Sequence, residues 1–111
     1  MSIRIGNVGI DTNDLPRATA FWQAVTGYQL ASSDESGNYL EDPAKAGVGL
    51  WVQLVPEPAT GKNRLHLDLF TADPAAEVAR IRGLGASEVR AFDGWTVLAD
   101  PDGNQFCVVA A

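Results

Sequence analysis

The 111-residue chain has few of the residues that point directly to a chemistry, because it contains one cysteine, one histidine and only eight lysines and arginines. The single cysteine, Cys107, excludes a disulfide within the chain. The single histidine, His66, excludes the two-histidine, one-carboxylate site of iron oxygenases. The net charge of −6 argues against a surface for nucleic acid or for an anionic membrane.

Long apolar runs are missing as well. The N-terminal sequence MSIRIGNVGID lacks the apolar stretch of a signal peptide. No run approaches the length that a membrane-spanning helix needs. We therefore expect a cytoplasmic protein with a single domain over residues 1–111 and no membrane partner.

The chain repeats its own sequence in a preserved order. NVGIDTNDLP (7–16) matches HLDLFTADPA (66–75) 59 positions later, LEDP (40–43) matches LADP (98–101) 58 positions later, and VQLV (52–55) matches FCVV (106–109) 54 positions later. Each match is weak, but their order predicts two copies of one supersecondary unit. The expected modules are residues 1–57 and 62–111.

Each copy has the pattern of a strand, a helix and three further strands. Asp14 and Asp73 are expected helix N-caps, each with a proline in the first turn, and Gly27 is placed to end the first helix. Expected strands lie near 3–11, 28–32, 37–41 and 48–55, and near 64–70, 87–92, 94–99 and 104–109. The turn DPDG (100–103) is expected to join the last two strands.

Apolar spacing predicts which residues form the core. The expected core residues are Ala18, Phe21, Trp22 and Val25 on the first helix, Val78, Ile81 and Leu84 on the second helix, and Leu65, Leu67 and Leu69 on strand 64–70. Trp95 could lie at a rim or in the core.

Two βαβββ units of this length resemble the vicinal oxygen chelate superfamily, and within it the glyoxalase-like and bleomycin-resistance branch. The resemblance rests on NVGIDTNDLPRATAFW (7–22), NRLHLDL (63–69) and LADPDGNQFCVV (98–109). It implies an α+β fold in which two modules form a U-shaped, half-open eight-stranded barrel. The groove of that barrel holds a metal in the enzymes, and a drug or metabolite in the sequestering members. Many members are dimers, so a homodimer is an expected assembly.

The resemblance implies four metal-ligand positions, which are occupied here by Asn7, Gln53, His66 and Cys107. This set contains no carboxylate, whereas Mg²⁺ and Mn²⁺ prefer hard oxygen ligands. Zn²⁺ is the one exception, since it could take the imidazole and the thiolate, although two amides are poor partners. We therefore expect no metal and no other cofactor.

Strand alternation predicts a shared concave face for polar residues of both modules. The expected ligand-binding residues are Asn7, Asp11, Gln53, His66, Asp68, Phe70 and Cys107, with Trp51 as an aromatic wall. Such a face is typical of a pocket for a small organic molecule. The pair of His66 and Asp68 could also position a general base, or His66 could activate the Cys107 thiol.

These patterns favour a module that binds a small molecule without a metal, with sequestration or drug resistance as its use. Two alternatives are enzymes: a lyase or dioxygenase of the superfamily type, and a metal-independent enzyme that uses cysteine and histidine. A further alternative is an interaction domain that has no ligand of its own. The ligand and the catalytic residues, if there are any, cannot be named from the sequence.

Overall fold

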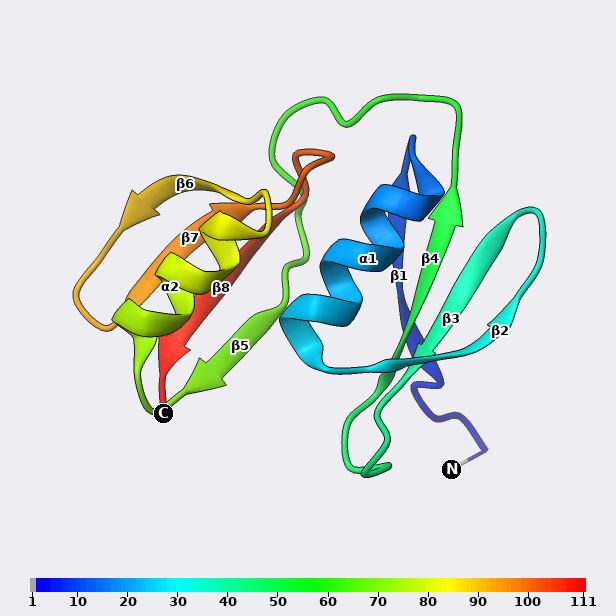
Figure 1. Cartoon of the computed structure of the whole chain (residues 1–111), viewed down its shortest axis with the longest axis horizontal. Coiled ribbons are helices and arrows are strands. Elements are labelled where there is room, and N and C mark those ends of the chain that lie inside the picture. Colours follow the sequence, from blue (N-terminus) through cyan, green and yellow to red (C-terminus); the bar gives the residue numbers. More distant parts are fainter. Residues whose placement is uncertain (1) are drawn as a thin grey trace. The chain divides into compact units, whose positions relative to one another are not determined.

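The computed structural model describes residues 2–111 and divides the chain into two compact units (Figure 1). The first module ends at Pro58, and the second module runs from Ala59 to Ala111. Each module consists of one helix and one four-stranded sheet.

The first module contains β1 (Asn7–Thr12), α1 (Leu15–Thr26), β2 (Gln29–Ser33), β3 (Gly37–Glu41) and β4 (Gly49–Leu54). Its strand order is β1-β4-β3-β2, in which β1 runs parallel to β4 and the other pairs are antiparallel. Helix α1 lies across one face of this sheet, over β3 and β4.

The second module repeats this topology with β5 (Asp68–Thr71), α2 (Pro74–Gly83), β6 (Ser87–Ala91), β7 (Trp95–Ala99) and β8 (Gln105–Ala110). The strand order is β5-β8-β7-β6, and again only the first pair is parallel. The predicted α+β class and the two βαβββ modules are therefore confirmed.

Short-range chemistry sets the ends of both helices. The Asp14 carboxylate accepts the Arg17 N–H at the start of α1, and the Asp73 carboxylate accepts the Ala76 N–H at the start of α2. Gly27 has φ 75° and ends α1 in the left-handed conformation that glycine adopts without strain. Both predicted N-caps and this C-cap are confirmed.

Each module buries apolar side chains between its helix and its sheet. The buried residues include Phe21, Trp22, Leu40 and Val52 in the first module, and Ile81, Leu98, Phe106 and Val108 in the second module. Trp22 is thus a core residue, as predicted, whereas Trp95 is 42% exposed. Among the described residues, no helix is long and apolar enough to cross a bilayer.

Two leucines predicted for the core are exposed, and both lie just outside a regular element: Leu65 precedes β5 and Leu84 follows α2. Leu65 is 88% exposed because β5 begins only at Asp68. Leu84 is 38% exposed because it follows the last residue of α2. Strand β1 also begins later than expected, at Asn7, which pairs with the first residue of β4, Gly49.

The strand register corrects one of the predicted repeat matches. Gly9 pairs with Trp51 in the first module, and Asp68, 59 positions after Gly9, pairs with Cys107 in the second. The counterpart of Cys107 is therefore Trp51, not Gln53, and the last-strand match was displaced by two residues. Alternation has a period of two, so a shift of two residues leaves the predicted face unchanged.

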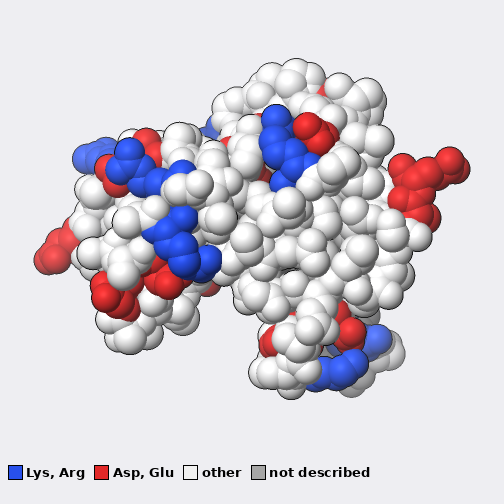
Figure 2. Space-filling model, in the orientation of Figure 1, with Lys and Arg blue, Asp and Glu red and all other residues white. Residues whose placement is uncertain are grey.

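Acidic and basic side chains lie close together on the displayed face (Figure 2). Lys45 contacts Glu41 at 2.7 Å, and Arg80 contacts Glu77 at 2.7 Å. No continuous basic surface is visible on this face of the described chain.

Candidate functional site

The face of the first sheet opposite α1 carries all four site residues predicted in the first module. Asp11 is the direct partner of Gln53, and both side chains are exposed. Trp51 lies two residues before Gln53 on β4, and Asn7 lies at the start of β1. The predicted side-chain alternation therefore holds for this group.

Two aromatic rings on this face lie over glycines of the neighbouring strand. Tyr39 on β3 is the direct partner of Trp51 on β4. A Cβ atom at Gly37 would come within 2.5 Å of Cζ2 of the Trp51 ring, and one at Gly49 would overlap the Tyr39 ring. The Trp51 indole N–H donates to Gln53 Oε1 at 3.1 Å, which fixes the orientation of the indole.

Our sequence analysis did not include Tyr39 or the two glycines in the site. The signal for them is a glycine-x-aromatic pattern that occurs in consecutive strands, as Gly37-Asn38-Tyr39 and as Gly49-Leu50-Trp51. In an antiparallel pair, side chains diagonally across the strands come within reach of each other. Each ring then fills the space above the other strand's glycine.

The four site residues predicted in the second module also lie in one region of that module. His66 Nε2 is 3.2 Å from Asp68 Oδ1, and Asp68 is the direct strand partner of Cys107. The potential ligand atoms of His66, Asp68 and Cys107 all lie within 4.8 Å of one another. Phe70, two residues along β5 from Asp68, is 71% exposed.

A short loop holds the segment before β5 against β8. The Gln105 N–H donates to Asn63 Oδ1 at 2.8 Å, and the Asn63 amide donates to the Gln105 carbonyl at 3.1 Å. The same amide group also donates to the Leu65 carbonyl. Further along, the Cys107 N–H donates to the Leu67 carbonyl at 2.9 Å. His66 is therefore held between two residues whose backbone positions are fixed.

The surroundings of Cys107 disfavour a reactive thiolate. Burial raises the pKa of the Cys107 thiol, and the Asp68 carboxylate raises it further through its charge and a hydrogen bond, while Lys62 has a smaller opposing effect. Reactive cysteines need the opposite environment, with positive charge nearby and a lowered pKa. Although the imidazole lies near the thiol, the raised pKa of Cys107 gives no support to the alternative of an activated cysteine–histidine pair.

The four superfamily ligand positions do not fit a hard divalent cation. Asn7 and Gln53 offer only neutral amides, and Gln53 Oε1 already accepts the Trp51 indole N–H. The register also makes Trp51 the counterpart of Cys107, and a tryptophan side chain does not act as a metal ligand. However, Asp68 places a carboxylate beside His66 and Cys107 in the second module, although it is not one of these four positions.

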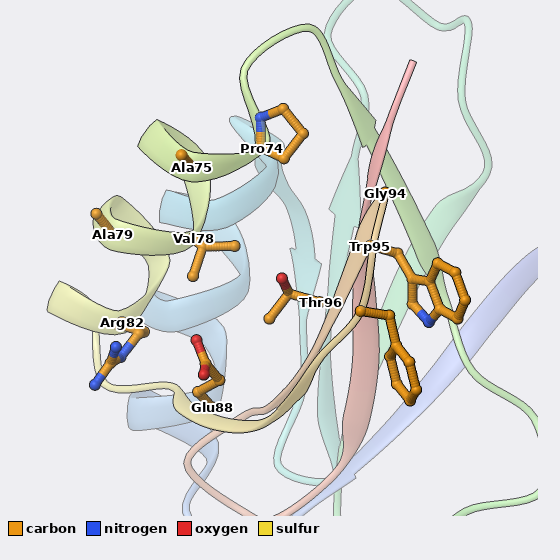
Figure 3. A pocket seen from close by; sticks show the side chains of 10 residues that line it. Pro74, Ala75, Val78, Ala79, Arg82, Glu88, Gly94, Trp95 and Thr96 are labelled. Atoms are coloured by element: carbon orange, nitrogen blue, oxygen red, sulfur yellow. The ribbon is translucent and has the colours of Figure 1, made fainter.

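A hollow of about 490 Å³ lies between α2 and the strands β6 and β7 (Figure 3). Val78 from α2 and Thr96 from β7 point toward each other across it. In the first module, the positions corresponding to these are Thr19 and Asn38, and the Asn38 amide donates to Thr19 Oγ1 at 2.9 Å. Val78 and Thr96 replace this hydrogen-bonded pair at the hollow of the second module.

Comparison with solved structures shows similarity over the whole chain. A glyoxalase/bleomycin resistance protein/dioxygenase family enzyme from Burkholderia phytofirmans PsJN has a TM-score of 0.79 at 19% identity, covering 97% of this chain and 98% of that one. The fosfomycin resistance protein FosX from Listeria monocytogenes has a TM-score of 0.79 at 18% identity, covering 100% and 93%. A glyoxalase/bleomycin resistance protein from Albidiferax ferrireducens T118 has a TM-score of 0.71 at 23% identity, covering 96% and 97%.

Identities this low establish the fold and leave the function open. No curated protein matches the chain closely enough to count as a relative. The family model of the glyoxalase-like domain matches residues 7–109, which is nearly the whole chain. The repeated βαβββ topology, the structural neighbours and this match agree, and the chain belongs to the glyoxalase-like domain family.

Proposed function

We propose that this chain binds a small organic molecule on the face of the first sheet that carries Tyr39 and Trp51. The observation that supports this most directly is the placement of the two rings over Gly49 and Gly37. Glycines at these positions let the rings lie close to the backbone, where larger residues would hold them away. The result is an aromatic surface that exists before a ligand arrives.

Preorganisation matters because a ligand then does not have to order the side chains that contact it. The Trp51 indole N–H donates a hydrogen bond to Gln53 Oε1 at 3.1 Å, and this bond orients the indole. Asn7 and Asp11 add polar groups on the same face. Flat apolar surface with a few polar groups fits a planar organic molecule that carries hydrogen-bonding groups.

Charge favours a cation over an anion as the ligand. The net charge of −6 attracts cations at long range. On the strands of this face, the charged side chains that share the side of Trp51 are Asp11 and Glu41, and Lys45 contacts Glu41 from the loop after β3. We therefore expect a planar cation to bind more tightly than a planar anion of similar size.

We expect the chain to bind its ligand without transforming it, because the described residues offer two arguments against catalysis. The hard-cation site of the superfamily does not fit, and the pKa of the Cys107 thiol is raised rather than lowered. Two structural relatives are named as drug resistance proteins, against fosfomycin and bleomycin. These names support resistance to a small molecule as a use of the binding surface.

The test is a titration with two fluorescent tricyclic probes, cationic 9-aminoacridine and anionic anthracene-9-carboxylate. We expect the cation to bind the wild-type protein, and Trp51→Leu to weaken that binding about tenfold, which equals 1.4 kcal/mol. Tyr39→Leu should act in the same direction. Trp95→Leu is the matched control, because it removes an exposed indole from the other module.

Two results would count against the proposal. One is that neither probe binds the wild-type protein. The other is that Trp51→Leu and Trp95→Leu weaken binding equally, because that would mean the probe adheres to any exposed ring. Circular dichroism of each variant ensures that a loss of binding is not a loss of folding.

A further inference from the structure

We infer that the hollow between α2 and the strands β6 and β7 binds a free α-amino acid with an apolar side chain, which Arg82 and Glu88 hold by its two charges. The inference goes beyond the proposed function, because the hollow belongs to the second module and lies on the helix-covered face of its sheet. The aromatic rings of the proposed function lie on the first sheet instead, on the face opposite α1.

The size and the lining of the hollow fit a small ligand. Its volume of about 490 Å³ lies within the range of about 300–1,000 Å³ that is usual for ligand sites, which combine apolar walls with a few polar groups. Ala75, Val78 and Ala79 form the wall on α2, and Thr96 lies on the strand side (Figure 3). Because Ala75 and Ala79 are exposed, a ligand can enter without a movement of the backbone.

A glutamate lies where the core side of a strand usually has an apolar residue. Glu88 on β6 is the direct partner of Leu98 on β7, so the two side chains leave the sheet on the same face. Leu98 is fully buried between the sheet and α2. The Glu88 carboxylate therefore projects into the hollow and not away from the helix, as Figure 3 shows.

Arg82 brings the opposite charge to the same end of the hollow. It lies in the last turn of α2, and Pro74, the first residue of that helix, lies at the other end of the hollow (Figure 3). In residues 2–111, neither Arg82 nor Glu88 has an ion pair or a side-chain hydrogen bond. Both charges are therefore available to one ligand, which has to replace only water.

The first module shows that the fold does not require these two charges. The helix N-caps align Gln23 with Arg82, and the strand register aligns Leu30 with Glu88. Neither counterpart is charged, and the hydrogen bond between helix and sheet described above crosses the corresponding space of the first module. The hollow and its two charges therefore occur together in the second module.

These two charges suit the two ionised groups of an α-amino acid. A guanidinium can donate two parallel hydrogen bonds to a carboxylate, and a carboxylate accepts the N–H bonds of an ammonium group. With its carboxylate at Arg82 and its ammonium group at Glu88, the amino acid would direct its side chain along Val78 and Ala79. These two residues offer no side-chain hydrogen-bonding group, so an apolar side chain fits, whereas a polar one would lose its bonds to water.

The test uses L-leucine and two analogues that each lack one charge, 4-methylpentanoate without the ammonium group and 3-methylbutylamine without the carboxylate. We expect leucine, added up to about 10 mM, to shift the backbone amide NMR signals of Ala79 and Thr96. Each analogue should bind about tenfold more weakly or worse, because it leaves one charge of the hollow without a partner.

Two variants assign the charges to their residues. Arg82→Gln, which introduces the side chain found at Gln23, should weaken leucine binding about tenfold and leave the binding of 3-methylbutylamine unchanged. Glu88→Gln should weaken leucine binding to a similar extent and leave the binding of 4-methylpentanoate unchanged. Arg80→Gln is the matched control, because it removes the same charge from the same helix outside the hollow.

The inference is overturned if leucine leaves the amide signals of the hollow unchanged. It is also overturned if leucine and both analogues bind equally well, since the apolar wall alone would then account for binding, or if Arg82→Gln and Arg80→Gln weaken binding equally. All three substituted side chains are exposed, so the variants are expected to fold. Failure here would leave the proposed ligand face intact, because variants of Trp51 and Tyr39 test that face separately.

Discussion

Tyr39 and Trp51 are direct partners across β3 and β4, and each ring lies over the glycine two residues before the other. This arrangement makes each glycine part of the candidate site, even though a glycine offers no side chain to a ligand. It also gives the two glycines different roles in stability, because different kinds of atoms surround them.

We predict that Gly37→Ala destabilises the first module by about 1–3 kcal/mol, the usual cost of overpacking. An added Cβ would lie 2.5 Å from the Trp51 ring and 2.7 Å from the backbone oxygen of Val52, and a backbone oxygen cannot move aside. Gly49→Ala should cost less, because the three atoms nearest to an added Cβ all belong to the Tyr39 side chain, which can rotate. Urea unfolding measures both differences.

The control for these substitutions is Gly83→Ala, at the last residue of α2, where an added Cβ meets nothing within 4 Å. It should be neutral or stabilising by up to about 1 kcal/mol, since alanine is the better helix former. If Gly37→Ala were equally harmless, the ring would not be lying over Gly37, and the aromatic surface described above would be wrong.

The sequence was sufficient to predict the elements and half of the expected core residues, because those depend on local chemistry. The helix caps are an example. Asp14 and Asp73 act through short-range hydrogen bonds and Gly27 acts through its φ preference, and each of these properties can be read from the residue type. Leu65 and Leu84 were predicted wrongly because apolar periodicity continues past the point where hydrogen bonding of the element stops. Periodicity alone does not show where an element ends.

The candidate site was less predictable, because it depends on register. Alternation placed Asp68 and Cys107 on one face, but their direct pairing follows from the parallel register of β5 and β8. The same register replaced Gln53 by Trp51 as the counterpart of Cys107. Tyr39 was missed because alternation predicts the face on which a ring lies, but does not predict that the ring packs over a glycine of the neighbouring strand.

We predict that stability falls at alkaline pH through Cys107. Burial and the Asp68 carboxylate raise the pKa of the thiol in the folded state, so folding favours the protonated form. The resulting stabilisation is complete below the ordinary pKa of cysteine and is lost as pH rises through the raised value. Chemical denaturation in metal-free buffer across this alkaline range should show the decline.

Asp68→Asn is the variant that tests this cause. It removes the negative charge and the carboxylate acceptor, so the pKa of Cys107 should fall part of the way back, because burial remains. Alkylation by iodoacetamide should then begin at a lower pH than in the wild-type protein, whereas Asp11→Asn should leave the profile unchanged. A profile identical in Asp68→Asn and wild type would show that Asp68 does not influence the thiol.

We predict that acid loosens the loop after β3 through Asp42. Its carboxylate accepts the N–H groups of Gly47 at 2.7 Å, Ala44 at 2.9 Å and Ala46 at 3.1 Å, and these bonds lower the pKa of Asp42. A lowered pKa means that the stabilisation is present above the ordinary value and is lost as pH falls through the lowered one.

Amide hydrogen exchange at Ala44, Ala46 and Gly47 measures this effect directly. Corrected for the intrinsic pH dependence, protection at these three amides should decrease in acid, and Asp42→Asn should lower protection already at neutral pH. Glu57→Gln is a control that removes a charge without touching the loop. Equal protection in Asp42→Asn and wild type would contradict the assigned role of the carboxylate.

Our last prediction concerns the hollow between α2 and β7. Replacing Val78 by Thr and Thr96 by Asn in the same chain rebuilds the pair that joins Thr19 to Asn38 in the first module at 2.9 Å. A net hydrogen bond contributes about 0.5–1.5 kcal/mol, and the two substitutions should show a favourable coupling of that size. Each single variant should be less stable than the double variant, because it has a polar group without its new partner. Urea unfolding of the four proteins gives the coupling as a double-mutant cycle. A coupling near zero would mean that the two introduced side chains do not meet across the hollow in the way that Thr19 and Asn38 meet in the first module.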